Sequence, residues 1–275
     1  MKTGNKILLI TDIPGYGKVA MAAQVPILSK MGFDLYNLPT ALVSNTLNYG
    51  VFDIAITTDY MVNTIAAWKE LEFDFDAISV GFIGEPAQIP IIEEFVEYHR
   101  KRNDKLIVGL DTIMGDDGSL YHGIEDNTID SMRELCHIVD YITPNWTEAC
   151  FITGYDYQER VDREFAKKIA EKLYKRTGSQ VVVTSIPLKD GMTMAVRDNE
   201  TLSLVDYEEL PIHMPGTGDI FSAVLLGNYM KGKSLMEATK KAAQVVKEML
   251  SKSMDQKDKF HGVPIEQYLG EVEVC

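Results

Sequence analysis

The sequence has little that would anchor the chain in a membrane or export it. Every apolar run is shorter than the roughly 18 residues that a membrane helix needs. The first run, residues 7–10, is too short for the core of a signal peptide. The chain has only 3 cysteines, Cys136, Cys150 and Cys275, whose odd number and wide spacing indicate neither a disulfide framework nor a zinc site. We therefore expect a cytoplasmic protein with buried or terminal thiols.

Positive charge is also scarce. Lys and Arg number 27 against 41 Asp and Glu, which gives a net charge of −14. A surface this acidic repels phosphodiester backbones and anionic lipids, so neither nucleic acid nor a membrane is an expected partner. The charge does not exclude a small phosphorylated ligand, because backbone N–H groups can hold phosphate inside an acidic protein.

Short apolar runs alternate with amphipathic stretches along the whole chain. Nearly continuous apolar strands between helices are typical of a mostly parallel sheet with helices on both faces. Because 275 residues with 45% hydrophobic content suit one core, we expect a single α/β domain over residues 1–275. In such sheets ligands bind at the carboxyl ends of the strands. The predicted strands are 6–11, 76–83, 105–110, 138–143 and 180–184, with a hairpin at 192–205, and the predicted helices are 19–30, 89–102, 163–177, 218–230 and 235–253.

Two glycine-rich turns compete as the phosphate-binding loop. The first, residues 15–20 (GYGKVA), fits the G-x-G-x-x-A pattern of dinucleotide-binding proteins, which leaves a nicotinamide-dependent oxidoreductase as an alternative. That pattern also needs an acidic residue at the end of the next strand to bind ribose, whereas Asp34 lies at the start of its strand. The other interpretation is a tight turn that brings the backbone close to a ligand.

The second turn, residues 215–219 (PGTGD), leads directly into the apolar face of a long helix. Gly216 and Gly218 permit backbone conformations in which successive N–H groups point into one concavity at a helix N-terminus, where an anion is stabilised. Asp219 is then placed to take a proton from a hydroxyl while the turn stabilises a transferring phosphoryl group. The other interpretation of Asp219 is an ordinary helix-start carboxylate.

Three separated motifs resemble those of the ribokinase-like superfamily of small-molecule kinases. They are residues 111–116 (DTIMGD), residues 145–148 (NWTE) and residues 216–219 (GTGD). Within that superfamily, residues 12–17, 44–45 and 81–82 resemble the pyridoxal/pyridoxamine kinases. The resemblance implies a ribokinase-like, three-layer α/β/α sandwich with a mostly parallel central sheet, and commonly a homodimer. It also implies ATP-dependent phosphorylation of the 5′-hydroxymethyl group of pyridoxal, pyridoxine or pyridoxamine.

The resemblance further implies roles for individual residues. The catalytic residues would be Asp219 as general base and Gly216, Thr217 and Gly218 as the anion hole. The ATP-binding residues would be Asn145, Glu148, Thr184 and Thr217. Mg²⁺ and a monovalent cation such as K⁺ would be held, mostly through water, at Asp111, Asp116 and Glu148. The vitamer would contact Asp12, Val19, Ser44, Thr46 and Phe82.

The sequence departs from the family pattern at several of these places. Asp12 stands where many relatives have serine, and residues 46–47 (TL) replace His-Thr, so an imidazole near the vitamer is missing. Thr112 replaces a proline that would stiffen its turn. Asp116 and Glu148 also have ordinary interpretations, as turn and helix-start charges. The alternatives are therefore a hydroxymethylpyrimidine kinase, which uses the same apparatus, and a catalytically silent vitamin-binding protein on the same fold.

Overall fold

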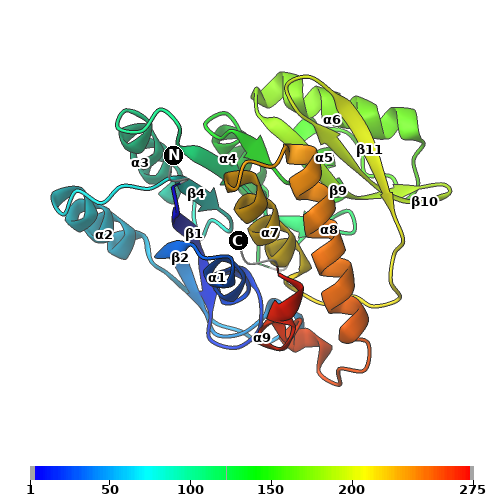
Figure 1. The fold of residues 1–275 in the computed structure, drawn as a ribbon, viewed down its shortest axis with the longest axis horizontal. Helices are drawn as coiled ribbons and strands as arrows, with labels where there is room; N and C mark the ends of the chain where they lie inside the picture. The colour runs from blue at the N-terminus through cyan, green and yellow to red at the C-terminus, as the bar shows by residue number, and fades with distance from the viewer. Residues whose placement is uncertain (1–3, 122, 273–275) are drawn as a thin grey trace. The chain divides into compact units, whose positions relative to one another are not determined.

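The computed structural model describes residues 4–121 and 123–272, so Cys275 lies outside the described residues. The chain divides into two compact units. The first comprises Met1–Ile107 with Leu210–Cys275, and the second comprises Val108–Glu209. Each unit has its own strands and helices (Figure 1).

The first unit is built around one buried strand. Strand β1 carries the continuous apolar run Ile7–Ile10, all fully buried, as in strands covered on both faces. Strands β2 and β4 pair with β1 in parallel, and β3 pairs with β2 in antiparallel orientation. The bounds are β1 Lys6–Pro14, β2 Asp34–Val43, β3 Ile54–Ile56 and β4 Ala77–Val80.

Strand β1 runs past the end that the sequence predicted for it. A register shift between Thr11 and Ile13 lets β1 and β2 continue pairing to Pro14 and Val43. Because of this shift, Asp12 lies within the strand and not in the loop that follows it. The irregularity is typical of strand ends next to functional sites.

Helix α1 connects the strands of the first unit to helix α7. Helix α1 packs on β1, β2 and α7, and α7 packs on α8, while α2 packs on β2 and α3 (Figure 1). The bounds are α1 Ala20–Lys30, α2 Thr58–Glu70, α3 Gln88–Arg100, α7 Thr217–Met230, α8 Leu235–Lys252 and α9 Ile265–Tyr268, with 3-10 turns at Leu47–Tyr49, Lys259–His261 and Leu269–Glu271. The predicted helices α1, α3, α7 and α8 are confirmed to within two residues. No helix within residues 4–121 or 123–272 has the length and apolar content to cross a membrane.

The second unit combines parallel and antiparallel strands. Strands β5, β8 and β9 pair in parallel, and β10 pairs with β9 and β11 in antiparallel orientation, which confirms the predicted hairpin. A small hairpin, β6 with β7, lies in the loop after β5. The bounds are β5 Ile107–Leu110, β6 Gly115–Asp116, β7 Ser119–Leu120, β8 Tyr141–Ile142, β9 Gln180–Leu188, β10 Gly191–Arg197, β11 Leu202–Tyr207, α4 Asn127–Leu135, α5 Trp146–Thr153 and α6 Arg163–Thr177.

Two predicted strand bounds in this unit are wrong. The strand predicted at 138–143 is only Tyr141–Ile142 long, because parallel pairing to β5 covers just these residues. The strand predicted to end at Thr184 continues to Leu188, because β10 pairs with its second half. Ser185, with a φ of 55°, marks the irregular point between the two halves.

A buried histidine in the first unit makes stability depend on pH. His99 packs against the rings of Phe75, Phe95 and Tyr98, and its Nε2 has no hydrogen-bond partner among the described residues. Burial, reinforced by the nearby Arg102 charge, lowers the pKa of His99 to about 4. The unfolded chain therefore binds a proton at this residue more tightly than the folded chain does. Stability is retained above pH 6.5 and is lost as the pH falls towards 4.

We expect His99→Phe to remove that part of the acid sensitivity. Between pH 7 and pH 4.5, the wild type should lose about 2 to 3 kcal/mol more of its free energy of unfolding than the variant does. Urea unfolding of both proteins across this range measures the difference. Parallel pH profiles for the two proteins would contradict the assignment.

Candidate active site

In the first unit, three of the five predicted vitamer residues lie near the carboxyl ends of parallel strands. Asp12 lies near the end of β1, Ser44 follows β2, and Phe82 follows β4. Thr11 connects two of these places. Its hydroxyl accepts a hydrogen bond from the Phe82 backbone N–H at 3.1 Å and donates to Asp12 Oδ1 at 3.3 Å. The fold therefore brings Asp12 and Phe82 together, as expected for a ligand site in an open α/β sheet.

Asp12 is buried, which makes its ionised form energetically unfavourable. It is 8% exposed, and burial raises the pKa of its carboxyl to about 6. The hydrogen bond donated by Thr11 lowers this pKa, but by less than burial raises it. The folded protein holds this proton more tightly than the unfolded chain does, so this contribution to stability is complete below pH 3.8 and is lost as the pH rises through 6. A buried titratable group of this kind is typical of functional sites.

We expect Asp12→Asn to stabilise the protein at alkaline pH. The neutral amide avoids ionising a buried group, so the gain should reach about 2 to 3 kcal/mol at pH 8 and vanish near pH 4. Urea unfolding at the two pH values measures it. The exposed Asp104→Asn is the matched control, and an equal gain at both pH values would contradict the explanation.

The other predicted vitamer residues have different surroundings. The Thr46 hydroxyl donates to the backbone oxygen of Phe260 at 2.7 Å, and its backbone N–H donates to the Tyr16 oxygen at 3.1 Å. Val19 is the residue immediately before α1. Ser44 is exposed and accepts a hydrogen bond from the Asp53 backbone N–H at 2.8 Å.

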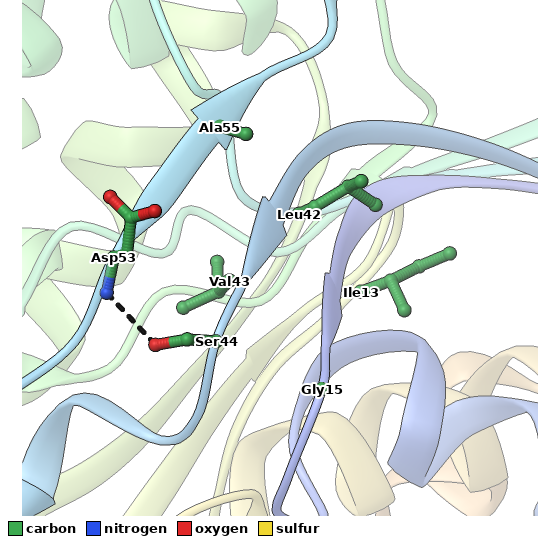
Figure 2. Close-up of a pocket in the computed structure, with 7 residues that line it drawn as sticks. All are labelled: Ile13, Gly15, Leu42, Val43, Ser44, Asp53 and Ala55. Carbon is green, nitrogen blue, oxygen red and sulfur yellow. Dashed lines mark hydrogen bonds between the residues drawn. The ribbon is translucent and has the colours of Figure 1, made fainter.

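Ser44 and Asp53 lie on the wall of a pocket of about 360 Å³ (Figure 2). Asp12 does not line this pocket, although its neighbour Ile13 does. The lining residues are Ile13, Gly15, Leu42, Val43, Ser44, Asp53 and Ala55.

The C-terminal segment, residues 258–266, is hydrogen-bonded and ion-paired to the first glycine turn. The Lys18 backbone N–H donates to the His261 oxygen at 2.7 Å, and the Lys18 ammonium pairs with Glu266. The Tyr49 hydroxyl donates to Asp258 at 2.6 Å. The His261 ring lies 4.8 Å from the ring of Tyr16, so the C-terminal segment brings an imidazole to this turn.

The two glycine turns that competed in the sequence are neighbours in the structure. Gly216 precedes α7 with a φ of 85°, and a Cβ there would overlap the Lys18 carbonyl oxygen. Gly262, with a φ of 84°, approaches the same oxygen, and a Cβ on it would lie 3.0 Å away. Glycine is therefore required at Gly216 both by the left-handed conformation and by the close backbone approach.

The start of α7 has the features needed for binding an anion. The first N–H groups of a helix have no partner within the helix, and here they include those of Thr217 and Gly218. Gly218 is exposed, whereas Asp219 is 8% exposed. The Asp219 carboxylate accepts a hydrogen bond from Gln24, a residue of α1 that the sequence motifs do not mark.

In the second unit, the start of α5 holds the loop that carries the DTIMGD motif. Asn145 and Glu148 form a capping box, in which each side chain accepts from the other's backbone N–H. The Asn145 amide donates to the Gly115 oxygen at 2.7 Å, and Thr147 Oγ1 accepts from the Gly118 N–H at 2.9 Å. These hydrogen bonds connect the NWTE motif to the loop that carries the DTIMGD motif.

Glu148 is the centre of this arrangement. Its carboxylate accepts hydrogen bonds from the Asn145 N–H at 2.9 Å, the Thr112 hydroxyl at 3.0 Å and the Met114 N–H at 3.1 Å. Burial and the adjacent negative charge of Asp111 nevertheless raise the pKa of Glu148 to about 8. A cation next to the buried Glu148 and the half-buried Asp111 would offset the repulsion between their negative charges.

The donor set fits a hydrated Mg²⁺ ion rather than a protein cage. Among residues 4–121 and 123–272, no cluster of three His, Cys, Asp or Glu side chains is positioned to hold a metal. Mg²⁺ prefers one or two carboxylates, with water and substrate phosphate completing its shell. Asp111 and Glu148 supply such carboxylates, and Asp116 is exposed on the adjoining hairpin.

Thr184 lies beside Asn145. Its backbone N–H donates to the Pro144 oxygen at 2.9 Å, and Asn145 and Thr184 form an isolated parallel bridge. The fold therefore groups Asn145, Glu148 and Thr184, the predicted nucleotide residues of this unit.

Comparison with known proteins agrees with this geometry. The model of the phosphomethylpyrimidine kinase family matches residues 21–264. The chain belongs to this family. A Bacteroides thetaiotaomicron protein assigned as a phosphomethylpyrimidine kinase, and crystallised with pyridoxal, is 33% identical. It has a TM-score of 0.91, with 98% of this chain and 96% of that chain covered.

Members named as pyridoxal kinases are also similar. The structure of the Lactobacillus plantarum pyridoxal kinase has a TM-score of 0.88 at 27% identity, covering 98% of this chain and 96% of that one. A pyridoxal kinase of Rubrobacter xylanophilus is 26% identical over 91% of this chain and 88% of its own. The predicted ribokinase-like fold and the predicted kinase family are therefore confirmed.

Proposed function

We propose that this member of the phosphomethylpyrimidine kinase family transfers the γ-phosphoryl group of ATP to the 5′-hydroxymethyl group of pyridoxal, pyridoxine or pyridoxamine. The observation that carries the proposal is Asp219 at the start of α7, directly after the Gly216 turn. A carboxylate beside a helix N-terminus supplies both a base and an anion site. The relative crystallised with pyridoxal supports the ring class.

Asp219 accepts the proton of the substrate hydroxyl as the hydroxyl oxygen attacks the γ-phosphorus. A phosphorus–oxygen bond forms to the substrate, the bond from the γ-phosphorus to the bridging oxygen breaks, and ADP leaves. The N–H groups of Thr217 and Gly218 stabilise the charge on the transferring phosphoryl group. The products are the vitamer 5′-phosphate, ADP and the proton.

In this proposal, ATP and its cations bind to residues of the second unit. Asn145 and Thr184 contact the nucleotide, and Asp111, Asp116 and Glu148 hold Mg²⁺ and a monovalent cation such as K⁺ through water. Bound Mg²⁺ would neutralise charge on the phosphate oxygens. The position of the buried Glu148 beside the charge of Asp111 supports this assignment, because a bound cation would offset the repulsion between the two carboxylates.

A hydroxymethylpyrimidine kinase is the second candidate. The name of the family model favours it, and the two substrates share a hydroxymethyl group on a nitrogen-containing ring. A nicotinamide-dependent oxidoreductase is a weaker alternative, because the turn at residues 15–20 packs against the Gly216 turn and the C-terminal segment.

The proposal is tested by supplying Mg-ATP with pyridoxal, pyridoxine, pyridoxamine, hydroxymethylpyrimidine or ribose and measuring ADP release and the phosphorylated product. We expect turnover with the pyridines and none with ribose. Turnover with the pyrimidine alone would establish the second candidate, and no turnover with any pyridine would overturn the first.

Cytoplasmic localisation and a homodimer stay predictions. We infer a homodimer in which a second copy of the chain covers exposed apolar side chains of the first unit. Sedimentation of the protein would measure its oligomeric state. These side chains are Leu42, Val51, Ile56, Tyr60 and Val62.

A further inference from the structure

A buried amide contacts the proposed catalytic base. Gln24 lies on α1, which packs against α7 (Figure 1), and is 2% exposed. Its Nε2 donates a hydrogen bond to Asp219 Oδ1 at 3.4 Å. A carboxylate can only accept, so the amide nitrogen rather than the amide oxygen must face it.

The other end of the same amide is unsatisfied. Gln24 Oε1 is buried and has no hydrogen-bond partner among the residues that the structure describes. An unpaired buried acceptor lowers stability, whereas an apolar side chain of similar length would avoid this penalty. The other buried residues of α1 are Ala20, Met21, Ala23, Ile27 and Leu28. Packing alone therefore favours an apolar residue at position 24, and the contact with Asp219 is what the amide adds.

We propose that Gln24 is a positioning residue for Asp219, which rests on the proposed function of Asp219 as base. Its N–H bond to Oδ1 restricts rotation of the carboxylate and presents the other oxygen, Oδ2, to the substrate hydroxyl. Gln24 is not a catalytic residue, because it acts through Asp219. Fixing a base in a productive orientation affects turnover more than substrate binding.

The first test is Gln24→Met, which preserves length and removes the donor. We expect kcat to fall by about 10- to 100-fold, with the KM values for pyridoxal and ATP changing less than about 3-fold. The urea midpoint should stay unchanged or rise, because the unpaired oxygen is also removed. An unchanged kcat, or a loss that appears mainly in KM, would overturn the proposal.

A matched control is Asn228→Leu. Asn228 is another buried amide and lies on α7, but it donates to the backbone oxygen of Val224 at 2.8 Å. This substitution should lower the urea midpoint and leave kcat within about 2-fold of wild type. An equal kcat loss in both variants would show that Gln24 has a general packing role and would overturn the proposal.

A double-mutant cycle separates this inference from the proposed function. If Gln24 acts through Asp219, adding Gln24→Met to Asp219→Asn should change the residual rate by less than about 2-fold. A full further loss in that background would overturn the positioning role. Near-normal turnover of Asp219→Asn alone would instead reject Asp219 as the base, and with it the basis of this inference.

Gln24→Glu gives a readout in the pH dependence of the rate rather than in its size. A second carboxyl beside Asp219 forms a pair that retains a proton to higher pH, so the acidic limb of the kcat/KM profile should move upward by about one pH unit or more. An acidic limb that coincides with that of the wild type would contradict the contact.

Discussion

Asp219→Asn is expected to lower kcat for vitamer phosphorylation by about 10²- to 10⁴-fold while ATP and pyridoxal still bind. Asparagine has the same shape as aspartate but cannot accept the proton of the hydroxyl. The backbone N–H groups at the start of α7 are unchanged, so the anion site should be retained. Steady-state kinetics with Mg-ATP measure the loss, and calorimetric titration of pyridoxal and ATP measures binding.

The control for this prediction is Asp255→Asn, which changes an exposed carboxylate of the same unit. It should have near wild-type kinetics. Near-normal turnover of Asp219→Asn would show that Asp219 is only a helix-start charge, the other interpretation that its sequence position allows. A combined loss of binding and turnover would point to a structural role.

The alternation of strands and helices was predictable because hydrophobic periodicity reflects local geometry. Helix α6 has the predicted bounds, since both its N-cap, Asp162, and its closing glycine, Gly178, are local signals. Strand ends were less predictable because they depend on partners distant in the sequence. Strand β1 continues to Pro14 only because β2 pairs with it past an irregular register.

The motifs predicted which residues matter in the second unit but not how they are held. The sequence indicates Asn145 and Glu148 as a helix start and Asp111 as a separate acidic residue. The hydroxyl of Thr112, which replaces a usual proline, donates to Glu148, and no sequence pattern predicts this bond. Bonds between loops depend on tertiary placement, which periodicity does not encode.

The first unit contains contacts for which the sequence offers little signal. The C-terminal segment reaches Lys18 and Thr46 through backbone oxygens of His261 and Phe260, and a backbone oxygen has no residue-type signature. Gln24 offers a weak signal, because it falls on the apolar stripe of α1, one helical turn from Ala20 and Ile27. A polar residue on a buried stripe indicates a partner but does not identify it.

Gly216→Ala is expected to impair both stability and activity. Alanine at a φ of 85° is strained, and its Cβ would overlap the Lys18 carbonyl oxygen, so the turn before α7 must move. We expect a loss of about 2 to 4 kcal/mol in the free energy of unfolding from strain and overlap together. Displacement of the N–H groups should also lower kcat/KM about 100-fold. Urea unfolding and steady-state kinetics measure the two effects.

Gly232→Ala is the matched control, because Gly232 has the same φ of 85° but no described heavy atom within 4 Å of an added Cβ. It should lose about 1 kcal/mol from backbone strain alone and retain its kcat/KM. The difference between the two variants then measures the close approach of Gly216 to Lys18. Equal stability losses would show that the two glycine turns do not constrain each other. A Gly216→Ala variant that is destabilised but fully active would show that phosphoryl transfer does not depend on the position of this turn.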